Sequence, residues 1–149
     1  MGEIAVICIG NILRRDDGIG LRLKNWIERR FGKRIKVFDG GTDGLRLIHI
    51  LSEYEKVMII DSANFGGGAG EVRKINLNDV VVNGNSSTHF LNLCEMIEVS
   101  RIVYGKPREV VLVGIQVDDL SYGETLSEKI ERKIDRVRME IETHLRDLL

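Results

Sequence analysis

The residues from Ile4 to Ile9 form an uninterrupted apolar run of strand length. A strand that is apolar at every position has to be covered on both faces, as strands are inside a parallel sheet. Two later segments have the same character, Val57-Met-Ile-Ile-Asp61 and residues 109–116. These three segments predict the central strands of a sheet with helices on both sides.

Helical patterns separate the predicted strands. Ile19, Leu23, Trp26 and Ile27 recur at helical spacing after the loop of residues 10–17. We also expect a strand at residues 35–38, a short helix at 45–53, a short strand at 71–77 and a helix from 88 to about 103. The strand at 71–77 is expected at an edge of the sheet or antiparallel. A last helix, with Thr125 and Glu128 as its capping box, completes the pattern.

Alternation of strand and helix with short connections is typical of right-handed crossover units. The sequence therefore predicts an α/β fold, a three-layer sandwich in which a mainly parallel sheet of about five strands is flanked by helices. A length of 149 residues fits one domain that spans residues 1–149.

The composition argues against several kinds of partner. Lys and Arg number 22 against 23 Asp and Glu, so a net charge of -1 gives no general attraction for nucleic acid or anionic lipid. The apolar run at residues 4–9 lacks a basic flank and is too short for a signal peptide or membrane span, which favours the cytoplasm. Cys8 and Cys94 are isolated, so we expect buried thiols and no disulfide or thiolate metal site.

Acidic residues gather where the predicted parallel strands end. Asp16 and Asp17 follow the first strand, Asp39 follows the second, and Asp61 ends the third. Ligands of parallel sheets bind beyond these carboxyl ends, and His89, at the start of the next helix, could reach the same crevice from the side. Two carboxylates and an imidazole suit nickel or zinc, and a divalent cation would relieve the repulsion between the carboxylates.

Each of these residues also has a purely structural interpretation. Asp17 could cap the helix that follows it, and Asp39 before two glycines fits an ordinary turn. His89 could be a neutral surface histidine near a helix start. Asp61 is the strongest candidate, because a carboxylate directly after an apolar strand is costly unless it is paired or exposed.

The glycine-containing loops give little support for nucleotide binding. Residues 10–20 match neither the dinucleotide nor the Walker pattern, and the two aspartates would repel phosphate. The run Gly66-Gly-Gly-Ala-Gly70 lacks a Walker lysine, and a mobile loop is its better interpretation.

Several of these motifs occur together, in order, over most of the chain. They are Gly10-Asn-Ile-Leu-Arg-Arg-Asp-Asp-Gly-Ile-Gly20, Asp39-Gly-Gly-Thr42, Ile59-Ile-Asp61 and Ser87-Thr-His89. In this combination the chain resembles the hydrogenase maturation endopeptidases. The resemblance implies that Asp17, Asp61 and His89 are metal ligands, although the position of Asp17 is often glutamate in that family, and that Asp39 acts in cleavage or in substrate recognition.

The resemblance also implies an activity. It is that of an endopeptidase of the aspartic-type grouping that removes the C-terminal extension from the nickel-loaded large-subunit precursor of a nickel-iron hydrogenase. Nickel would arrive with the substrate, so we expect that the free protein can be isolated without metal. Two alternatives stay open: a nickel-binding chaperone or checkpoint that does not cut, and an α/β module for a small ligand.

Overall fold

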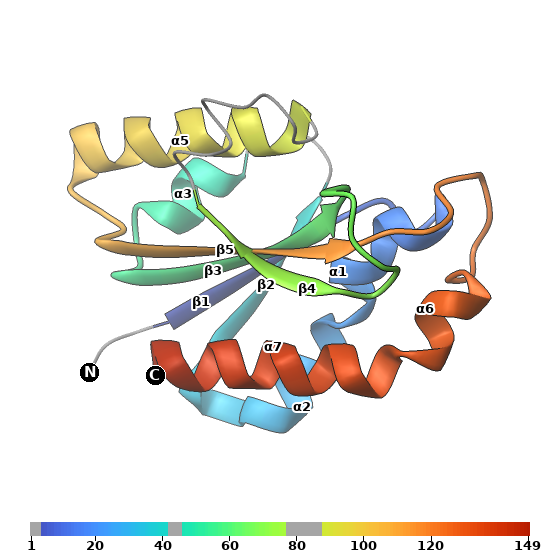
Figure 1. Ribbon diagram of the computed structural model, residues 1–149. Helices are drawn as coiled ribbons and strands as arrows, with labels where there is room; N and C mark the ends of the chain where they lie inside the picture. The colour runs from blue at the N-terminus through green and yellow to red at the C-terminus, as the bar shows by residue number, and fades with distance from the viewer. Residues whose placement is uncertain (1–3, 42–45, 77–87) are drawn as a thin grey trace.

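The computed structural model describes residues 4–41, 46–76 and 88–149, and in the last range it describes side chains from Leu93 onward. Strands and helices alternate along this part of the chain (Figure 1). The strands are β1 (Ile4–Ile9), β2 (Lys36–Gly41), β3 (Lys56–Ala63), β4 (Val72–Ile75) and β5 (Glu109–Gln116). The helices are η1 (Arg15–Gly18), α1 (Ile19–Arg22), α2 (Lys24–Phe31), η2 (Gly32–Arg34), α3 (Leu47–Leu51), α5 (Thr88–Tyr104), α6 (Glu128–Arg132) and α7 (Ile134–Leu148).

The five strands form one sheet in the order β2-β1-β3-β5-β4. β2, β1, β3 and β5 are parallel, and β4 pairs antiparallel with β5 at the edge. The predicted mainly parallel sheet is therefore confirmed, and so is the edge position of the short strand near residue 72. No helix in the described ranges is both long and apolar enough to cross a membrane.

Helices cover both faces of the sheet, which confirms the three-layer arrangement (Figure 1). Alternate residues of each strand point to opposite faces, so each strand contributes to both cores. One core lies against α1, α2, α6 and α7 and includes Val6, Cys8, Met58, Ile60, Val113, Ile19, Leu23, Ile27, Val137, Ile141 and Leu145. The other lies against α3 and α5 and includes Ala5, Ile7, Val57, Ile59, Leu112, Leu47, Ile50, Leu51, Leu93 and Ile97.

Two of the differences from the predicted bounds concern a residue that the sequence singled out. β2 continues to Gly41, because its backbone goes on pairing with β1 beyond Phe38, so Asp39 lies inside the strand and not in a loop after it. The last helix starts at Glu128 with Ser127 as its N-cap, whose hydroxyl oxygen accepts a hydrogen bond from the Ile130 amide at 3.4 Å. The predicted capping box with Thr125 at the N-cap is therefore wrong.

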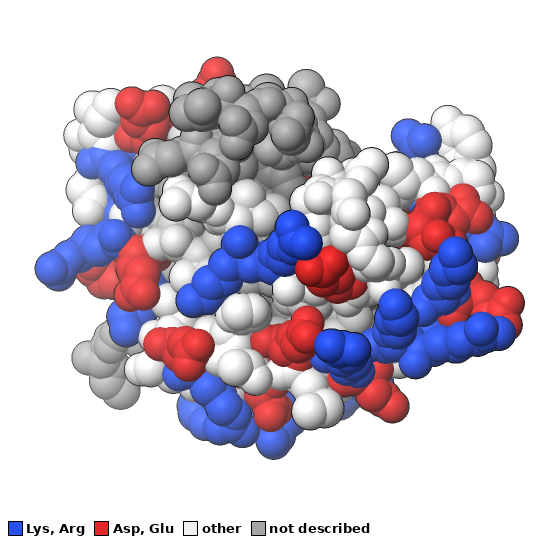
Figure 2. All heavy atoms as spheres, viewed as in Figure 1, with Lys and Arg blue, Asp and Glu red and all other residues white. Residues whose placement is uncertain are grey.

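Charged side chains of both signs are interspersed over the face seen in Figure 2. Some charged side chains of the protein form exposed ion pairs within one helix, such as Arg132 with Glu128 in α6 and Arg136 with Glu140 in α7. Pairs of this kind contribute little to stability. On this face the mixture agrees with the near-neutral net charge and forms no basic stripe.

Candidate functional site

The candidate site lies at the carboxyl ends of β1 and β3, where the chain connections run in opposite directions along the sheet. β1 and β3 are neighbours in the sheet, but the chain runs from β1 through α1 and α2 to β2 on one side of this pair, and from β3 to β4 and β5 on the other side. The carboxyl ends of two such strands border a crevice, which is the usual ligand position in open α/β sheets. Asp17 follows β1 in η1, and Asp61 lies near the end of β3.

The structure brings the carboxylates of Asp17 and Asp61 together around one hydroxyl group. The Ser62 hydroxyl donates to Oδ1 of Asp17 at 3.0 Å and lies 3.5 Å from Oδ1 of Asp61. Asp61 is fully buried, and its Oδ1 also accepts the backbone amide of Ser62 at 2.7 Å. Two acidic side chains that are far apart in the sequence thus meet at the edge of β1 and β3.

Asp17 does not cap the following helix. Gly18 is the N-cap of α1, with no side-chain capping bond, whereas Oδ2 of Asp17 accepts the backbone amide of Asn11 at 3.2 Å. The half-buried Asp17 carboxylate is therefore turned toward the strand ends, and its capping interpretation is wrong.

Glycines explain why the segment with Asp17 approaches the strands so closely. A Cβ atom at Gly20 would lie 2.6 Å from the carbonyl oxygen of Ile60 and 2.7 Å from that of Ile9. At Gly10, which has a φ of +153°, a Cβ atom would lie 2.4 Å from the carbonyl oxygen of Asp17. Only residues without a side chain allow this contact between backbones.

Asp16 has a structural position that the sequence did not reveal. Its fully buried carboxylate accepts four hydrogen bonds, from the amides of Asp118, Asp119 and Ser127 at 2.9, 2.8 and 2.7 Å and from the Ser127 hydroxyl at 2.8 Å. The backbones of the two loops are also joined, since the Gly123 amide donates to the Leu13 carbonyl at 2.9 Å. Asp16 therefore fastens the loop after β1 to the loop after β5 and to the start of α6.

Asp39 lies apart from the carboxylate pair. It is exposed on the edge strand β2, where its Oδ1 accepts the backbone amide of Gly41 at 2.8 Å. β1 separates it from β3, so two strand spacings, on the order of 10 Å, lie between Asp39 and Asp61. By alternation Asp39 shares the face of Val37, on the α2 side, whereas Asp61 shares that of Ile59, on the α5 side.

His89 is the second residue of α5, and its side chain lies outside the described part of the structure. Figure 1 shows the N-terminal end of α5 at the same edge of the molecule as the arrowheads of β3 and β5. Among the side chains that are described, no three or more His, Cys, Asp or Glu gather closely enough to hold a metal ion. The described part of the site is thus a pair of carboxylates, which supplies oxygen ligands for a divalent cation but not a complete set.

Gln116 is a second organising residue whose role the sequence pattern did not reveal. It is buried at the end of β5, and its Oε1 accepts the amides of Phe65 and Gly67 at 2.9 and 3.2 Å. Its Nε2 donates to Oδ1 of Asn64 at 3.2 Å and to the Val117 carbonyl at 3.0 Å. The glycine loop after β3, which the sequence predicts to be mobile, is therefore bound through this side chain. Like Asp61, Gln116 is a polar residue at the end of an apolar run, and that signal could have identified it.

The cysteine near the site is not poised for nucleophilic attack. Cys8 is fully buried one residue before the end of β1, and this burial raises the pKa of its thiol to about 12. Burial also raises the pKa of Cys94 in α5. The thiolate is the reactive form of cysteine, so neither thiol has the low pKa of a catalytic nucleophile.

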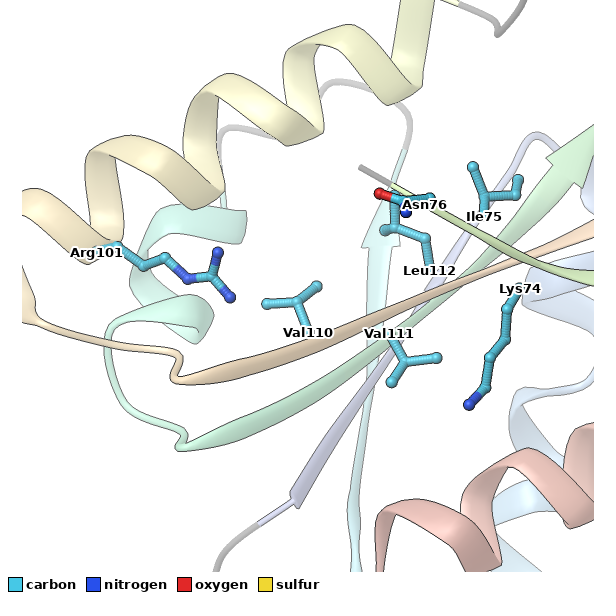
Figure 3. A pocket seen from close by; sticks show the side chains of 7 residues that line it. All are labelled: Lys74, Ile75, Asn76, Arg101, Val110, Val111 and Leu112. Carbon is cyan, nitrogen blue, oxygen red and sulfur yellow. The ribbon is translucent and has the colours of Figure 1, made fainter. Parts of the chain in front are cut away.

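A separate hollow of about 560 Å³ is lined by residues of α5, of β4 and its end, and of β5 (Figure 3). Its described lining combines Lys74 and Arg101 with Asn76 and the apolar residues Ile75, Val110, Val111 and Leu112. None of these lining residues is acidic, and Arg101 is engaged in a hydrogen bond from its Nε to the Pro107 carbonyl at 2.8 Å. The hollow is therefore distinct from the carboxylate pair in position and in chemistry.

Comparison of the sequence with known proteins gives a consistent result. The hydrogenase expression/formation protein HupD of Bradyrhizobium diazoefficiens is 30% identical over 79% of this chain, and the match spans 64% of that relative, slightly less than two thirds of its length. The hydrogenase 2 maturation protease of Escherichia coli is 26% identical, with 97% of this chain and 92% of the relative covered.

The fold is also that of a solved structure, the hydrogenase maturating endopeptidase HybD from E. coli. The two structures align with a TM-score of 0.81 at 24% identity, over 97% of this chain and 93% of the other. A sequence model of the hydrogenase maturation protease family matches residues 21–144, which is most of the chain. The protein belongs to the hydrogenase maturation protease family.

Proposed function

We propose that this protein is an endopeptidase that removes the C-terminal extension from the nickel-loaded large-subunit precursor of a nickel-iron hydrogenase. Membership of the family supports the hydrolytic activity and the hydrogenase partner. The observation that carries the proposal is the convergence of Asp17 and Asp61 on the Ser62 hydroxyl at the crevice between β1 and β3.

We propose further that Asp17, Asp61 and His89 recognise the nickel that the precursor carries. Two neighbouring carboxylates repel each other unless a cation or a proton lies between them, so a divalent ion is favoured at this position. Nickel held in part by the substrate would complete its coordination here. Binding the ion would then also place the adjoining peptide bond in the crevice.

The chemical step needs a group that accepts a proton from the attacking water. We propose that a carboxylate of the Asp17 and Asp61 pair takes this role, through an oxygen that does not bind the ion. Asp39 is exposed on β2 and separated from the pair by β1, which favours contact with the precursor over proton transfer at the pair.

A cleavage assay tests the proposal directly. The protein is incubated with nickel-loaded and with nickel-free precursor, and the released tail is measured by mass spectrometry. We expect release from the loaded precursor alone. Binding of the loaded precursor without release would instead identify a non-proteolytic chaperone, and absence of binding would favour a small-ligand module.

Substitutions test the ligand assignment in the same assay. Asp61→Asn and His89→Ala should each reduce release by at least about 100-fold, because the first variant replaces a charged ligand by a neutral amide and the second removes a ligand. Asp135→Asn is the matched control, since this carboxylate is 93% exposed on α7. Release at the wild-type rate by folded Asp61→Asn and His89→Ala proteins would end the assignment.

A further inference from the structure

The residue between the two carboxylates is a serine whose side chain and backbone have different partners. Its backbone amide donates to Asp61, and its hydroxyl donates to Asp17 across the boundary between β3 and η1. Ser62 is 7% exposed, so little water reaches the hydroxyl to take the place of either carboxylate.

The distances indicate which carboxylate depends on the hydroxyl. The Ser62 hydroxyl is 3.0 Å from Asp17 but 3.5 Å from Asp61, and one hydroxyl proton serves a single strong bond. Asp61 is held in addition by the Ser62 amide at 2.7 Å. Asp17 is held by the Asn11 amide at 3.2 Å on its other oxygen. The hydroxyl is therefore the described contact that draws Asp17 toward β3.

We propose that Ser62 is a positioning residue, whose hydroxyl turns the Asp17 carboxylate toward Asp61 so that both converge before a divalent cation arrives. This inference rests on the proposed nickel recognition. A bond from a neutral hydroxyl leaves further lone pairs on Asp17 for a cation. It also favours the geometry of the pair without adding positive charge, so a cation is still attracted. Side chains that orient metal ligands through hydrogen bonds in this way influence the affinity for the metal without contacting it.

Three variants distinguish a positioning role of Ser62 from a general effect on the stability of the protein. Ser62→Ala deletes the hydroxyl and retains the backbone amide that holds Asp61. Ser62→Thr keeps a hydroxyl on a β-branched side chain that suits a strand. Ser100→Ala is the matched control, because Ser100 is also buried and its hydroxyl donates to the Lys106 carbonyl at 2.6 Å, at the far end of α5.

The first measurement is the affinity of each purified protein for Ni²⁺ alone, by titration calorimetry. We expect the dissociation constant to rise about 10- to 100-fold in Ser62→Ala. It should stay near the wild-type value in Ser100→Ala and return toward it in Ser62→Thr. Equal Ni²⁺ affinities of Ser62→Ala and wild type would overturn the inference. This comparison is decisive even if the threonine side chain of Ser62→Thr does not fit at the site.

The second measurement is tail release from nickel-loaded precursor. We expect Ser62→Ala to raise KM by a similar factor with a smaller change in kcat, because the hydroxyl positions a ligand and does not react. A fall in kcat with KM unchanged would contradict the positioning role. A wild-type protein that neither binds Ni²⁺ nor cuts the loaded precursor would overturn the proposed function. If the wild type does both, and Ser62→Ala has the same Ni²⁺ affinity and the same KM, only this inference is overturned.

Discussion

Asp16 and Asp17 are adjacent in the chain, but their carboxylates have different surroundings. Asp16 is fully buried and accepts four hydrogen bonds from residues after β5. Asp17 is half-buried and accepts hydrogen bonds from Asn11 and Ser62. A carboxylate offers about four acceptor positions, so the four donors leave Asp16 little further capacity, whereas Asp17 retains capacity for a cation.

The variant Asp16→Asn should be less stable than the wild type. The amide nitrogen of the new side chain would face backbone N–H donors, and at least one hydrogen bond to a charged acceptor would be lost, at a cost of about 2–4 kcal/mol. Urea unfolding should therefore show a lower midpoint at an unchanged slope. Asp135→Asn serves again as the exposed control, and equal midpoints for the two variants would contradict the structural role of Asp16.

At the scale of elements, α1 is held by contact with the strands more than by its own helical structure. It contains only four residues and lacks a side-chain cap. A helix of this length is not stable by itself. Its position depends on the close contact of Gly20 with the ends of β1 and β3.

Gly20→Ala should therefore displace α1 and, with it, Asp17. The added Cβ would meet two backbone carbonyl oxygens that cannot move aside, and we expect a loss of about 1–3 kcal/mol together with slower tail release. Gly68→Ala is the control, because nothing lies within 4 Å of the added atom. Gly68→Ala should have a urea midpoint and a rate of tail release close to those of the wild type. If Gly20→Ala also has wild-type values, α1 tolerates the added methyl group and the expectation is wrong.

The sequence predicts elements well where burial alone decides them. β1 and β5 have the predicted bounds, because an apolar run covered on both faces has clear ends. The Asp-Gly-Gly composition at Asp39 favours a turn, but the backbone there goes on pairing with β1. That pairing involves a strand about 30 residues away, which a local pattern does not reveal.

The candidate site was predictable only in part for the same reason. Asp61 stands out locally as a carboxylate after an apolar strand, and its meeting with Asp17 follows once β1 and β3 are neighbours. The hydrogen bond from Ser62 to Asp17 spans 45 residues, and those from Ser127 to Asp16 span 111. Neither spacing carries a signal, because both depend on the complete fold.

At the scale of the molecule, α7 lies against β4 and brings a histidine into a partly buried position. Burial, and then the nearby charge of Lys74, lower the pKa of His144 below its ordinary value, while Asp147 and Glu140 oppose the shift. The folded state therefore favours neutral His144. The contribution of neutral His144 to stability is fully present above the ordinary histidine pKa of about 6.5. It is lost as the pH falls from there through the lower pKa that His144 has in the folded protein.

Removing this group should reduce the sensitivity to acid between about pH 7 and pH 5. We expect the thermal midpoint of wild type to fall over this range and that of His144→Gln to fall less, measured by circular dichroism at both pH values. His49→Gln is a suitable control, because its side chain is 81% exposed. The expectation is wrong if the thermal midpoints of His144→Gln and His49→Gln fall equally between about pH 7 and pH 5.

The bonds between Asp16 and Ser127 have a consequence for biosynthesis. They join an early loop to a residue that leaves the ribosome 111 residues later. Until Ser127 has been synthesised, the Asp16 carboxylate lacks two of its four hydrogen bonds, so the loop after β1 is not yet fastened to the start of α6. The segment that carries Asp16 and Asp17 is therefore fastened on this side only once Ser127 has been synthesised.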